Sequence, residues 1–464
     1  MSLRRALPLI GAAGAGILAA RAASGPTLVR WPVAARVGVP ILCGLAAAGV
    51  GAAAAGAVAA VLPGPRRTPS RTAAAVGAIG GILAGGVIAA GVAARGPVIR
   101  RLIAEGAGQE TAFAMPPANP SVSGSPPSAV PISTLGREGA RFVWSATSTE
   151  AIAEVTGRPA VASPIRVFVG YSSAPSVEER VALALDELHR TGALDRAHLL
   201  IQAPAGSGYA NSTPVEVLET LTGGDCATVV IGYGLLPSFL SLRRVPVAAQ
   251  TQRLLLEAIS ALVAGRPAGA RPTLHLYGES LGAEVQQAAL PMGTADLDHA
   301  GISSALWVGT PGGGGEFRAT LTEPCVVVDR PAQLEQIAPG EPVRAWFLEH
   351  DGDPVVRFRT DLLTRCPDWL APGEPRGRHV PEGMRWRPGI TWLQVGVDTL
   401  FATDIKPGDF HSLGHDYRAD LGRVTTSAFG LPADPSTLER LESYLRRAEV
   451  ARASLIEGSG AVAG

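Results

Sequence analysis

Residues Thr273–Val285 read TLHLYGESLGAEV and contain a G-x-S-x-G pattern centred on Ser280. This pattern puts its serine on a sharp strand-to-helix turn, where small neighbours are needed because the backbone is crowded. In a chain with 56 glycines the motif alone is weak, so its context carries the argument. A strand-like run, Thr273–Tyr277, precedes the serine and a helix-compatible run, Ala283–Ala289, follows it. We therefore predict a nucleophilic Ser280 at a strand-to-helix elbow, against the alternative of a glycine-rich turn with an inert serine.

Outward from this turn, apolar runs alternate with helical patterns. Ser176–Arg190 predicts a helix, because Ser176 and Glu179 can form a capping box and Gly192 can end it. A further helix is predicted at Ala248–Ala264, and strands at Ile165–Gly170, His198–Gln202, Ala227–Tyr233, Thr273–Tyr277, Ser304–Val308 and Val343–Leu348. Apolar strands separated by helices indicate a parallel sheet covered on both faces, so the predicted fold class is α/β, doubly wound.

A serine hydroxyl needs a base to take its proton and a third group to hold that base. In sheets with this elbow, the acid and then the histidine follow the serine along the chain. Asp353 lies in the turn after the strand Val343–Leu348 and is our predicted acid, with Asp351 second and an ordinary Asp-Pro turn as the alternative. Three histidines follow it: His379, His411 and His415. We predict His415, beside Gly414, as the base, with His411 second.

The oxyanion of an acyl-transfer intermediate requires two backbone N–H donors. One is predicted to be the amide of Leu281, directly after the nucleophile. The other is predicted in the glycine-containing loop Ala203–Tyr209, from Gly206, Ser207 or Gly208, with the loop Gly170–Ala174 as an alternative. A flexible turn is the competing interpretation of either loop. His275, in the strand before the elbow, is expected to be a core residue.

The first hundred residues differ in composition from the rest of the chain. Two uncharged runs, 37–62 and 72–94, exceed the ~20 residues that a helix needs to cross a bilayer, and a shorter run occupies 6–20. The segment 115–133 is rich in Pro and Ser and predicts an extended tether. The expected organisation is a membrane region at 1–110, a linker at 111–138, a catalytic domain at 139–456 and a disordered tail at 457–464.

Charge and cysteine content exclude several function classes. With 40 basic and 40 acidic residues the chain offers no electrostatic footprint for nucleic acid. Four scattered cysteines form no CxxC pair or metal-ligand spacing, although a single bridge such as Cys325–Cys366 is compatible with the count. No phosphate-binding G-x-x-x-x-G-K-[ST] motif occurs. We expect no cofactor and no metal.

Eight blocks in order resemble the membrane-anchored α/β-hydrolases of actinobacteria over roughly Pro164–Tyr417. The blocks are RVFVGYSSAPSVEER, ELHRTGALDR, AGSGY, GGDCATVVIGYGLLPSFLSL, LYGESLGAE, EHDGDPVVRF, GMRWRPGITWLQVGVD and GHDYRAD. The resemblance implies an α/β-hydrolase fold with Ser280, Asp353 and His415 as the triad. The glycine loop carries Ser207 and Tyr209 where relatives have Thr and Trp, and the anchor has fewer spans than is usual in that family.

The sequence therefore predicts a membrane-tethered serine hydrolase acting on an ester or thioester of an amphipathic or lipid substrate. Its expected partners are that small molecule and the lipid bilayer. Acyl transfer with the same triad and a hydrolase-like protein that binds without turnover are the alternatives. We expect a multi-pass protein of the cell membrane. Charge around the spans does not fix its orientation, and an extracytoplasmic catalytic domain is favoured.

Overall fold

The computed structural model describes residue 28 and residues 99–337, 343–373, 375–402 and 408–462, which fall in two compact units. The larger unit comprises Arg101–Arg357 and Thr403–Gly464, and the smaller comprises Met1–Arg100 and Phe358–Ala402. The predicted membrane runs 6–20, 37–62 and 72–94 lie outside the described residues. Among the residues that are described, no helix has both the length and the apolar character needed to cross a bilayer.

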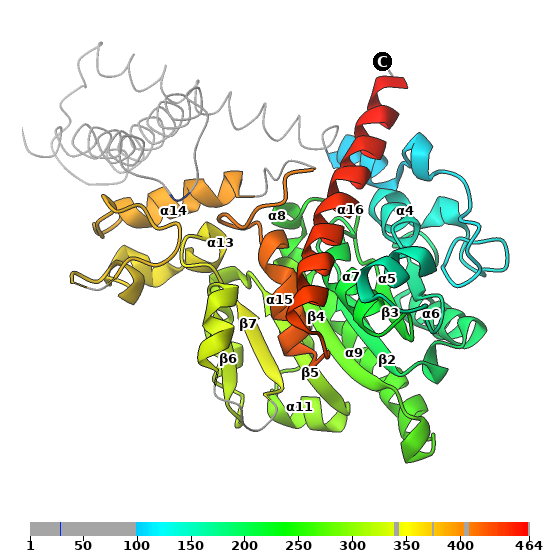
Figure 1. The fold of residues 1–464 in the computed structure, drawn as a ribbon. Coiled ribbons are helices and arrows are strands. Elements are labelled where there is room, and N and C mark those ends of the chain that lie inside the picture. The colour runs from blue at the N-terminus through cyan, green and yellow to red at the C-terminus, as the bar shows by residue number, and fades with distance from the viewer. Residues whose placement is uncertain (1–27, 29–98, 338–342, 374, 403–407, 463–464) are drawn as a thin grey trace, which may run out of the picture. The chain divides into compact units, whose positions relative to one another are not determined.

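The larger unit is built on a seven-stranded sheet in which every neighbouring pair of strands is parallel (Figure 1). The strands are β1 (Ile165–Val169), β2 (His198–Ala203), β3 (Cys226–Ile231), β4 (Thr273–Glu279), β5 (Ile302–Val308), β6 (Cys325–Val328) and β7 (Ala345–Leu348). Their order across the sheet is β1-β3-β2-β4-β5-β7-β6. The carboxyl ends of β2, β4, β5 and β7 are therefore neighbours, and ligands of such sheets bind at that edge.

The main helices form two groups, each packed together. One group is α6 (Val177–Thr191), α9 (Val245–Ala264) and α10 (Leu281–Ala289); the other is α5 (Thr149–Thr156), α7 (Ser212–Leu221), α15 (Arg418–Ala428) and α16 (Pro435–Val462). The shorter helices of this unit are α4 (Gly136–Trp144), α8 (Ser238–Ser241), α11 (Thr294–His299), α12 (Gly315–Arg318) and α13 (Pro354–Arg357). Cover from two groups of helices explains why β1 and β3 are buried along their whole length.

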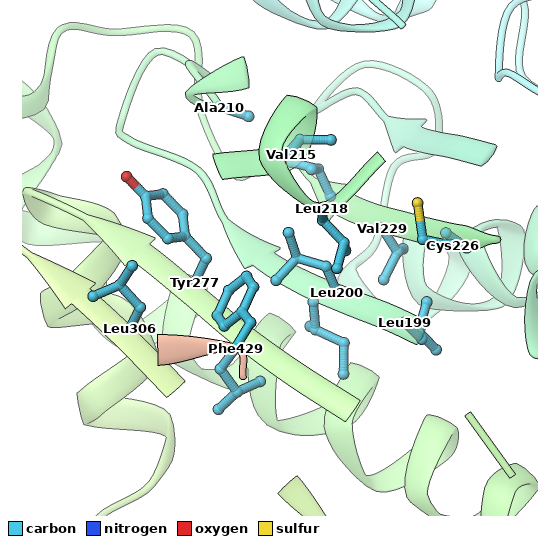
Figure 2. Close-up of a cluster of buried hydrophobic side chains, with 14 of the residues drawn as sticks. Leu199, Leu200, Ala210, Val215, Leu218, Cys226, Val229, Tyr277, Leu306 and Phe429 are labelled. Carbon is cyan, nitrogen blue, oxygen red and sulfur yellow. The ribbon is translucent and has the colours of Figure 1, made fainter. Parts of the chain in front are cut away.

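The hydrophobic core joins the central strands to α7 and is drawn in Figure 2. Its labelled buried side chains include Leu199, Leu200, Val229, Tyr277, Val215 and Leu218. Each of these large apolar side chains contributes about 1.5–3 kcal/mol when it is removed from water. The strands that end at the site are therefore held in a well-packed platform.

Most elements of the sheet were predictable from the apolar pattern. The predicted helix after β1 is α6, with the capping box between Ser176 and Glu179 and with Gly192 in a left-handed conformation at its end, as expected. Strand β6 was not predicted, and neither were most helices other than α6, α9 and α10, with α7 among those that were missed. Strand β6 has only four residues, three of them partly exposed or exposed, and α7 is buried on most of its faces, so neither shows a clear period.

The Pro/Ser-rich segment 115–133 differs from the extended tether that its composition predicts. Val122 and Val130 are fully buried in the core of the larger unit. The hydroxyls of Ser123 and Ser128 each donate a 2.9 Å hydrogen bond to the buried carboxylate of Glu187. The composition was misleading because the serines serve as partners for a buried charge and the two valines pack in the core. The larger unit accordingly begins at Arg101 rather than 139.

The smaller unit contains α14 (Ile390–Phe401) and its own core, made by Leu28, Leu362, Leu370, Val380, Met384 and Val395. The Trp386 indole donates a 3.0 Å hydrogen bond to the Leu362 carbonyl. Residues 358–402 fall within the predicted catalytic domain, 139–456. They instead form a separate cluster, because their apolar side chains pack on one another.

The structure also decides one point that the sequence left open, a possible disulfide, and corrects the expectation for the C-terminal tail. Cys325 and Cys366 are both free thiols, in different units, so the bridge that their number allowed is not formed. The expected disordered tail from 457 is, up to Val462, the last part of helix α16. The residues of that helix end include few strong helix formers, which explains why composition favoured disorder.

Candidate active site

Ser280 lies between the end of β4 and the start of α10 with φ 55° and ψ −126°, a conformation that costs energy for any residue other than glycine. Its backbone N–H donates a 2.8 Å hydrogen bond to the Val308 carbonyl at the end of β5. A Cβ on Gly278 would lie 2.8 Å from the Gly282 carbonyl oxygen, and one on Gly282 would lie 2.3 Å from that of Ala203. Both glycines of the motif are thus required by close backbone approach.

Asp353 follows β7 and is fully buried. Its Oδ1 accepts a 2.8 Å hydrogen bond from the Val355 amide. Its Oδ2 lies 2.7 Å from Nδ1 of His415. Asp351, the second candidate, instead pairs with Arg357, so it does not face the histidine. Of the two carboxylates in this turn, the structure brings Asp353 to the imidazole.

His415 lies in the loop before α15 and is 5% exposed. Reciprocal backbone hydrogen bonds of 3.0 and 3.1 Å between Leu413 and Asp416 form a tight turn around it, with Gly414 at φ 60°. This turn directs the ring inward. His411, the second candidate, is exposed before that turn. His379, the remaining histidine after the acid, belongs to the smaller unit.

The imidazole and the serine share one edge of the sheet. A Cβ on Gly309 would lie 2.9 Å from Cε1 of His415, and Gly309 directly follows Val308, which accepts the Ser280 amide. In the described residues the Ser280 hydroxyl makes no hydrogen bond to the ring. Such bonds are often long without substrate and tighten in the reacting complex. Ser280 and His415 are 135 positions apart in the sequence. The neighbouring ends of β4, β5 and β7 bring them to the same edge of the sheet.

Asp353 and His415 each favour the charged form of the other. Burial alone lowers the pKa of His415, but the facing carboxylate of Asp353, together with those of Glu279 and Asp416, outweighs burial, and the pKa of His415 is raised. Burial raises the pKa of Asp353, yet His415 and the hydrogen bonds that the carboxylate accepts hold that pKa below its ordinary value. Since the Nδ1–H of His415 donates to Asp353, Nε2 is left as the basic nitrogen in the neutral ring.

The first amides of α10 are available to an oxyanion. The amides of Leu281 and Gly282 precede the first helical hydrogen bonds, which Ala283 and Glu284 make to the Ser280 carbonyl. The loop Ala203–Tyr209 follows β2, the direct neighbour of β4, and touches the helix start through Ala203 and Gly282. The loop Gly170–Ala174 follows β1, which two strands separate from β4. Position in the sheet therefore favours the first loop.

The predicted loop donors are not equivalent. The amide of Gly208 donates a 2.9 Å hydrogen bond to the Ala205 carbonyl within the loop. The amides of Gly206 and Ser207 have no acceptor among the described residues. A Cβ on Gly206 would lie 2.4 Å from Oγ of Ser241, so glycine is required there for packing as well. Gly206 and Ser207 remain candidate donors, whereas Gly208 is engaged in shaping the loop.

Three side chains of the site were not predicted from the sequence. The hydroxyl of Tyr417 donates a 2.6 Å hydrogen bond to Oδ2 of Asp353. The buried ring of His350 stacks on Tyr417 at 3.9 Å and lies 2.9 Å from the Asp420 carboxylate. Glu279 accepts hydrogen bonds from Tyr277 and Asn211. Tyr417 and Glu279 lie within two residues of His415 and Ser280 in the sequence, which could have marked them as candidates. No pattern in the sequence indicates which way their side chains point.

His275 is a buried core residue, as expected. It lies 2.7 Å from Oγ of Ser304 and 3.0 Å from His198, and its ring stacks on Phe429. Burial lowers its pKa to about 3, so the ring stays neutral. In the described part of the chain no group of three or more His, Cys, Asp or Glu side chains is arranged to hold a metal ion.

Comparison with protein families agrees with this architecture. A family model described as the alpha/beta-hydrolase family matches residues 165–434, from the start of β1 to the turn before α16. The chain therefore belongs to the alpha/beta-hydrolase family, and a hydrolase-like function follows from that membership. Comparison with curated proteins gave no match, and comparison with solved structures gave none.

Proposed function

We propose that this protein is a membrane-anchored serine hydrolase that cleaves an ester or thioester of an amphipathic or lipid substrate. The observation that carries the proposal is the 2.7 Å contact between His415 Nδ1 and Asp353 Oδ2, at the sheet edge where Ser280 occupies a strained turn. A binding protein has no need of this arrangement, since neither the strain at the serine nor a buried ion pair aids recognition.

In the proposed reaction, Ser280 Oγ attacks the carbonyl carbon while His415 Nε2 takes the hydroxyl proton. Asp353 holds the ring and stabilises the imidazolium. The amide of Leu281, with that of Gly206 or Ser207, donates to the developing oxyanion. The imidazolium then returns its proton to the departing alcohol or thiol, leaving an acyl group on Ser280. Water, activated by the neutral imidazole, attacks this acyl-enzyme and releases the acid.

The test is labelling with a fluorophosphonate probe, comparing the natural chain with Ser280→Ala. We expect labelling of the natural chain and none of the variant. His415→Ala and Asp353→Asn should each lower the labelling rate by at least a hundredfold. Their matched controls, His411→Ala and Asp351→Asn, should stay within about threefold. Equal labelling of the natural chain and Ser280→Ala, or no labelling of either, would refute the proposal.

Acyl transfer differs from hydrolysis only in the acceptor. The acyl-enzyme formed on Ser280 can be trapped with a chromogenic ester and then challenged with water alone or with added alcohols. Release of free acid at the same rate in both conditions supports hydrolysis. Conversion of the acyl group to a new ester would assign the chain to the acyltransferases instead.

Membrane anchoring is the second part of the proposal and is supported by the uncharged runs 37–62 and 72–94. We propose a multi-pass protein of the cell membrane with an extracytoplasmic catalytic unit, which receives its substrates from the bilayer. Fractionation should recover the full chain with membranes after a carbonate wash. Protease added to intact cells should cut the larger unit. Recovery of the chain in the carbonate-soluble fraction would refute the anchor, and protection from protease would refute the orientation.

A further inference from the structure

Glu279, the residue directly before the nucleophile, carries a carboxylate that is fixed at one oxygen. Its Oε2 accepts a 2.7 Å hydrogen bond from the Tyr277 hydroxyl and another of 2.7 Å from Nδ2 of Asn211. Its Oε1 has no hydrogen-bond partner in the described part of the chain and is not completely buried there. The residue is half-buried, as is Ser280. One oxygen is thus anchored and the other is unpaired, in the residue next to the nucleophile.

The anchor connects Glu279 to the candidate oxyanion loop. Asn211 ends the segment that follows β2 and caps α7, with its Oδ1 accepting a 2.9 Å hydrogen bond from the Thr213 amide. Its own carbonyl accepts a 3.1 Å hydrogen bond from Gln202. Because Asn211 is held at both its side chain and its backbone, the Glu279 carboxylate cannot swing away from the serine without breaking this set of contacts.

The carboxylate also interacts electrostatically with the proposed base, His415. Burial raises the pKa of Glu279, while Asn211, Tyr277 and the neighbouring His415 favour the ionised form and Asp416 opposes it. The two donors on Oε2 compensate for part of the lost hydration. A fixed, partly dehydrated carboxylate oxygen beside a nucleophile binds an N–H or O–H donor well and repels an anion.

We propose that Glu279 determines the specificity of this site by binding a hydrogen-bond donor, an ammonium or a hydroxyl, that the substrate carries close to the scissile carbonyl. The substrate class is therefore a cationic or hydroxylated ester rather than an anionic one. This inference rests on the proposed function, since it requires a substrate that reacts at Ser280. It narrows that function by stating the charge and the donor that the substrate brings.

The test uses the full chain and ester pairs of matched size. On the acyl side these are the para-nitrophenyl esters of butyrate, β-hydroxybutyrate, β-aminobutyrate and succinate. On the leaving-group side they are the butyryl thioesters of 2-(dimethylamino)ethanethiol, whose protonated amine keeps one N–H, and of mercaptopropionate. The readout is the ratio of kcat/KM for the cationic or hydroxylated ester to that for the anionic one. Glu279→Gln should lower the cation-to-anion ratio about tenfold on at least one side, because hydrogen bonds to charged groups are strong. The esters differ in intrinsic reactivity, but this difference is the same for the natural chain and the variant, so it cancels when their ratios are compared.

The matched control is Glu284→Gln, which removes a half-buried carboxyl from the first turn of α10, the helix that follows Ser280. Its ratio should stay within about twofold of the natural one, which separates contact at Glu279 from a general change in charge.

Tyr277→Phe and Asn211→Ala should lower the ratio less than Glu279→Gln, since the charge remains but its anchor is weakened. An unchanged ratio in Glu279→Gln on both sides, with Ser280-dependent hydrolysis intact, overturns the inference and leaves the proposed function standing. Loss of fluorophosphonate labelling in the natural chain would instead refute the proposed function.

Discussion

The hydroxyl of Tyr417 donates its 2.6 Å hydrogen bond to the same oxygen of Asp353 that faces His415. The backbone N–H of His350 donates in turn to the Tyr417 oxygen at 3.2 Å. The phenol therefore shares the carboxylate with the imidazole. This sharing holds Asp353 in place and draws part of its negative charge away from the ring.

Tyr417→Phe should raise the pKa of His415 and lower activity. Without the phenol, more of the Asp353 charge acts on the imidazolium, so the acid limb of the kcat/KM profile should move to higher pH. We expect about a tenfold loss of kcat/KM at neutral pH and a loss of about 1–3 kcal/mol in the free energy of unfolding. The control is Tyr444→Phe, whose hydroxyl contacts Thr147 instead. Lower stability with an unmoved acid limb would reduce Tyr417 to a structural role.

Activity and stability should depend on pH in opposite ways. Burial lowers the pKa of His415, but the carboxylates of Asp353, Glu279 and Asp416 together outweigh burial and raise that pKa. The stabilisation from His415 is therefore fully present below about pH 6.5 and is lost as pH rises through the raised pKa. Asp353, whose pKa is lowered despite burial, stabilises above about pH 4, and this contribution is lost as pH falls through its lowered pKa. The pair should therefore stabilise most between about pH 4 and 6.5, whereas catalysis needs the neutral ring at higher pH.

Two measurements check this prediction. The difference in Tm between the natural chain and His415→Ala, followed against pH, should be largest in that acidic window and shrink above it. The acid limb of kcat/KM should have its midpoint above pH 6.5. A Tm difference that grows as the solution becomes alkaline, or an acid limb below pH 6, would contradict the assigned pair.

The strain at Ser280 should be measurable as stability. Glycine adopts φ 55° without penalty, so the free energy of unfolding of Ser280→Gly should exceed that of Ser280→Ala by about 1 kcal/mol. The glycine variant should accordingly have the higher Tm. Both variants should lack activity, because neither has the hydroxyl. Calorimetry on the two proteins gives the comparison, and equal Tm values would show that the turn relaxes when the serine is removed.

The sequence predicted the elbow, the acid and the histidine as candidates because each belongs to a local pattern. Ser280 has its glycines, Asp353 its strand end, and His415 its Gly414 turn, all visible within a few residues. The choice between Asp353 and Asp351 depended on which carboxylate a loop over 60 positions away would reach, and only the structure describes that contact. Local pattern specifies the turn, whereas tertiary packing selects the partner.

Other features had no local pattern to reveal them. The engagement of Gly208 within its loop, the sharing of Asp353 by Tyr417, and the anchoring of Glu279 by Asn211 all join residues from separate elements. The packing of segment 115–133 was hidden for a related reason. Its composition predicted an extended tether, whereas Ser123 and Ser128 bind Glu187 from α6. Buried polar contacts of this kind follow from the assembled fold, not from composition.

The contact between Gly282 and Ala203 provides the sharpest test of the candidate oxyanion loop. A Cβ at position 282 would lie 2.3 Å from the Ala203 carbonyl oxygen, a backbone atom that can move only with its loop. Gly282→Ala should therefore displace the loop Ala203–Tyr209 from the elbow. A shift of about 1 Å in a catalytic group can cost about a hundredfold in rate, and overpacking costs about 1–3 kcal/mol of stability. The loss should fall mainly on kcat, because the serine and histidine remain in place. The matched control is Gly269→Ala, where an added Cβ meets nothing within 4 Å, and both its kcat and its Tm should be those of the natural chain. If Gly282→Ala lowers Tm but retains kcat, the loop after β2 does not supply the second oxyanion donor, and the loop Gly170–Ala174 becomes the candidate to test.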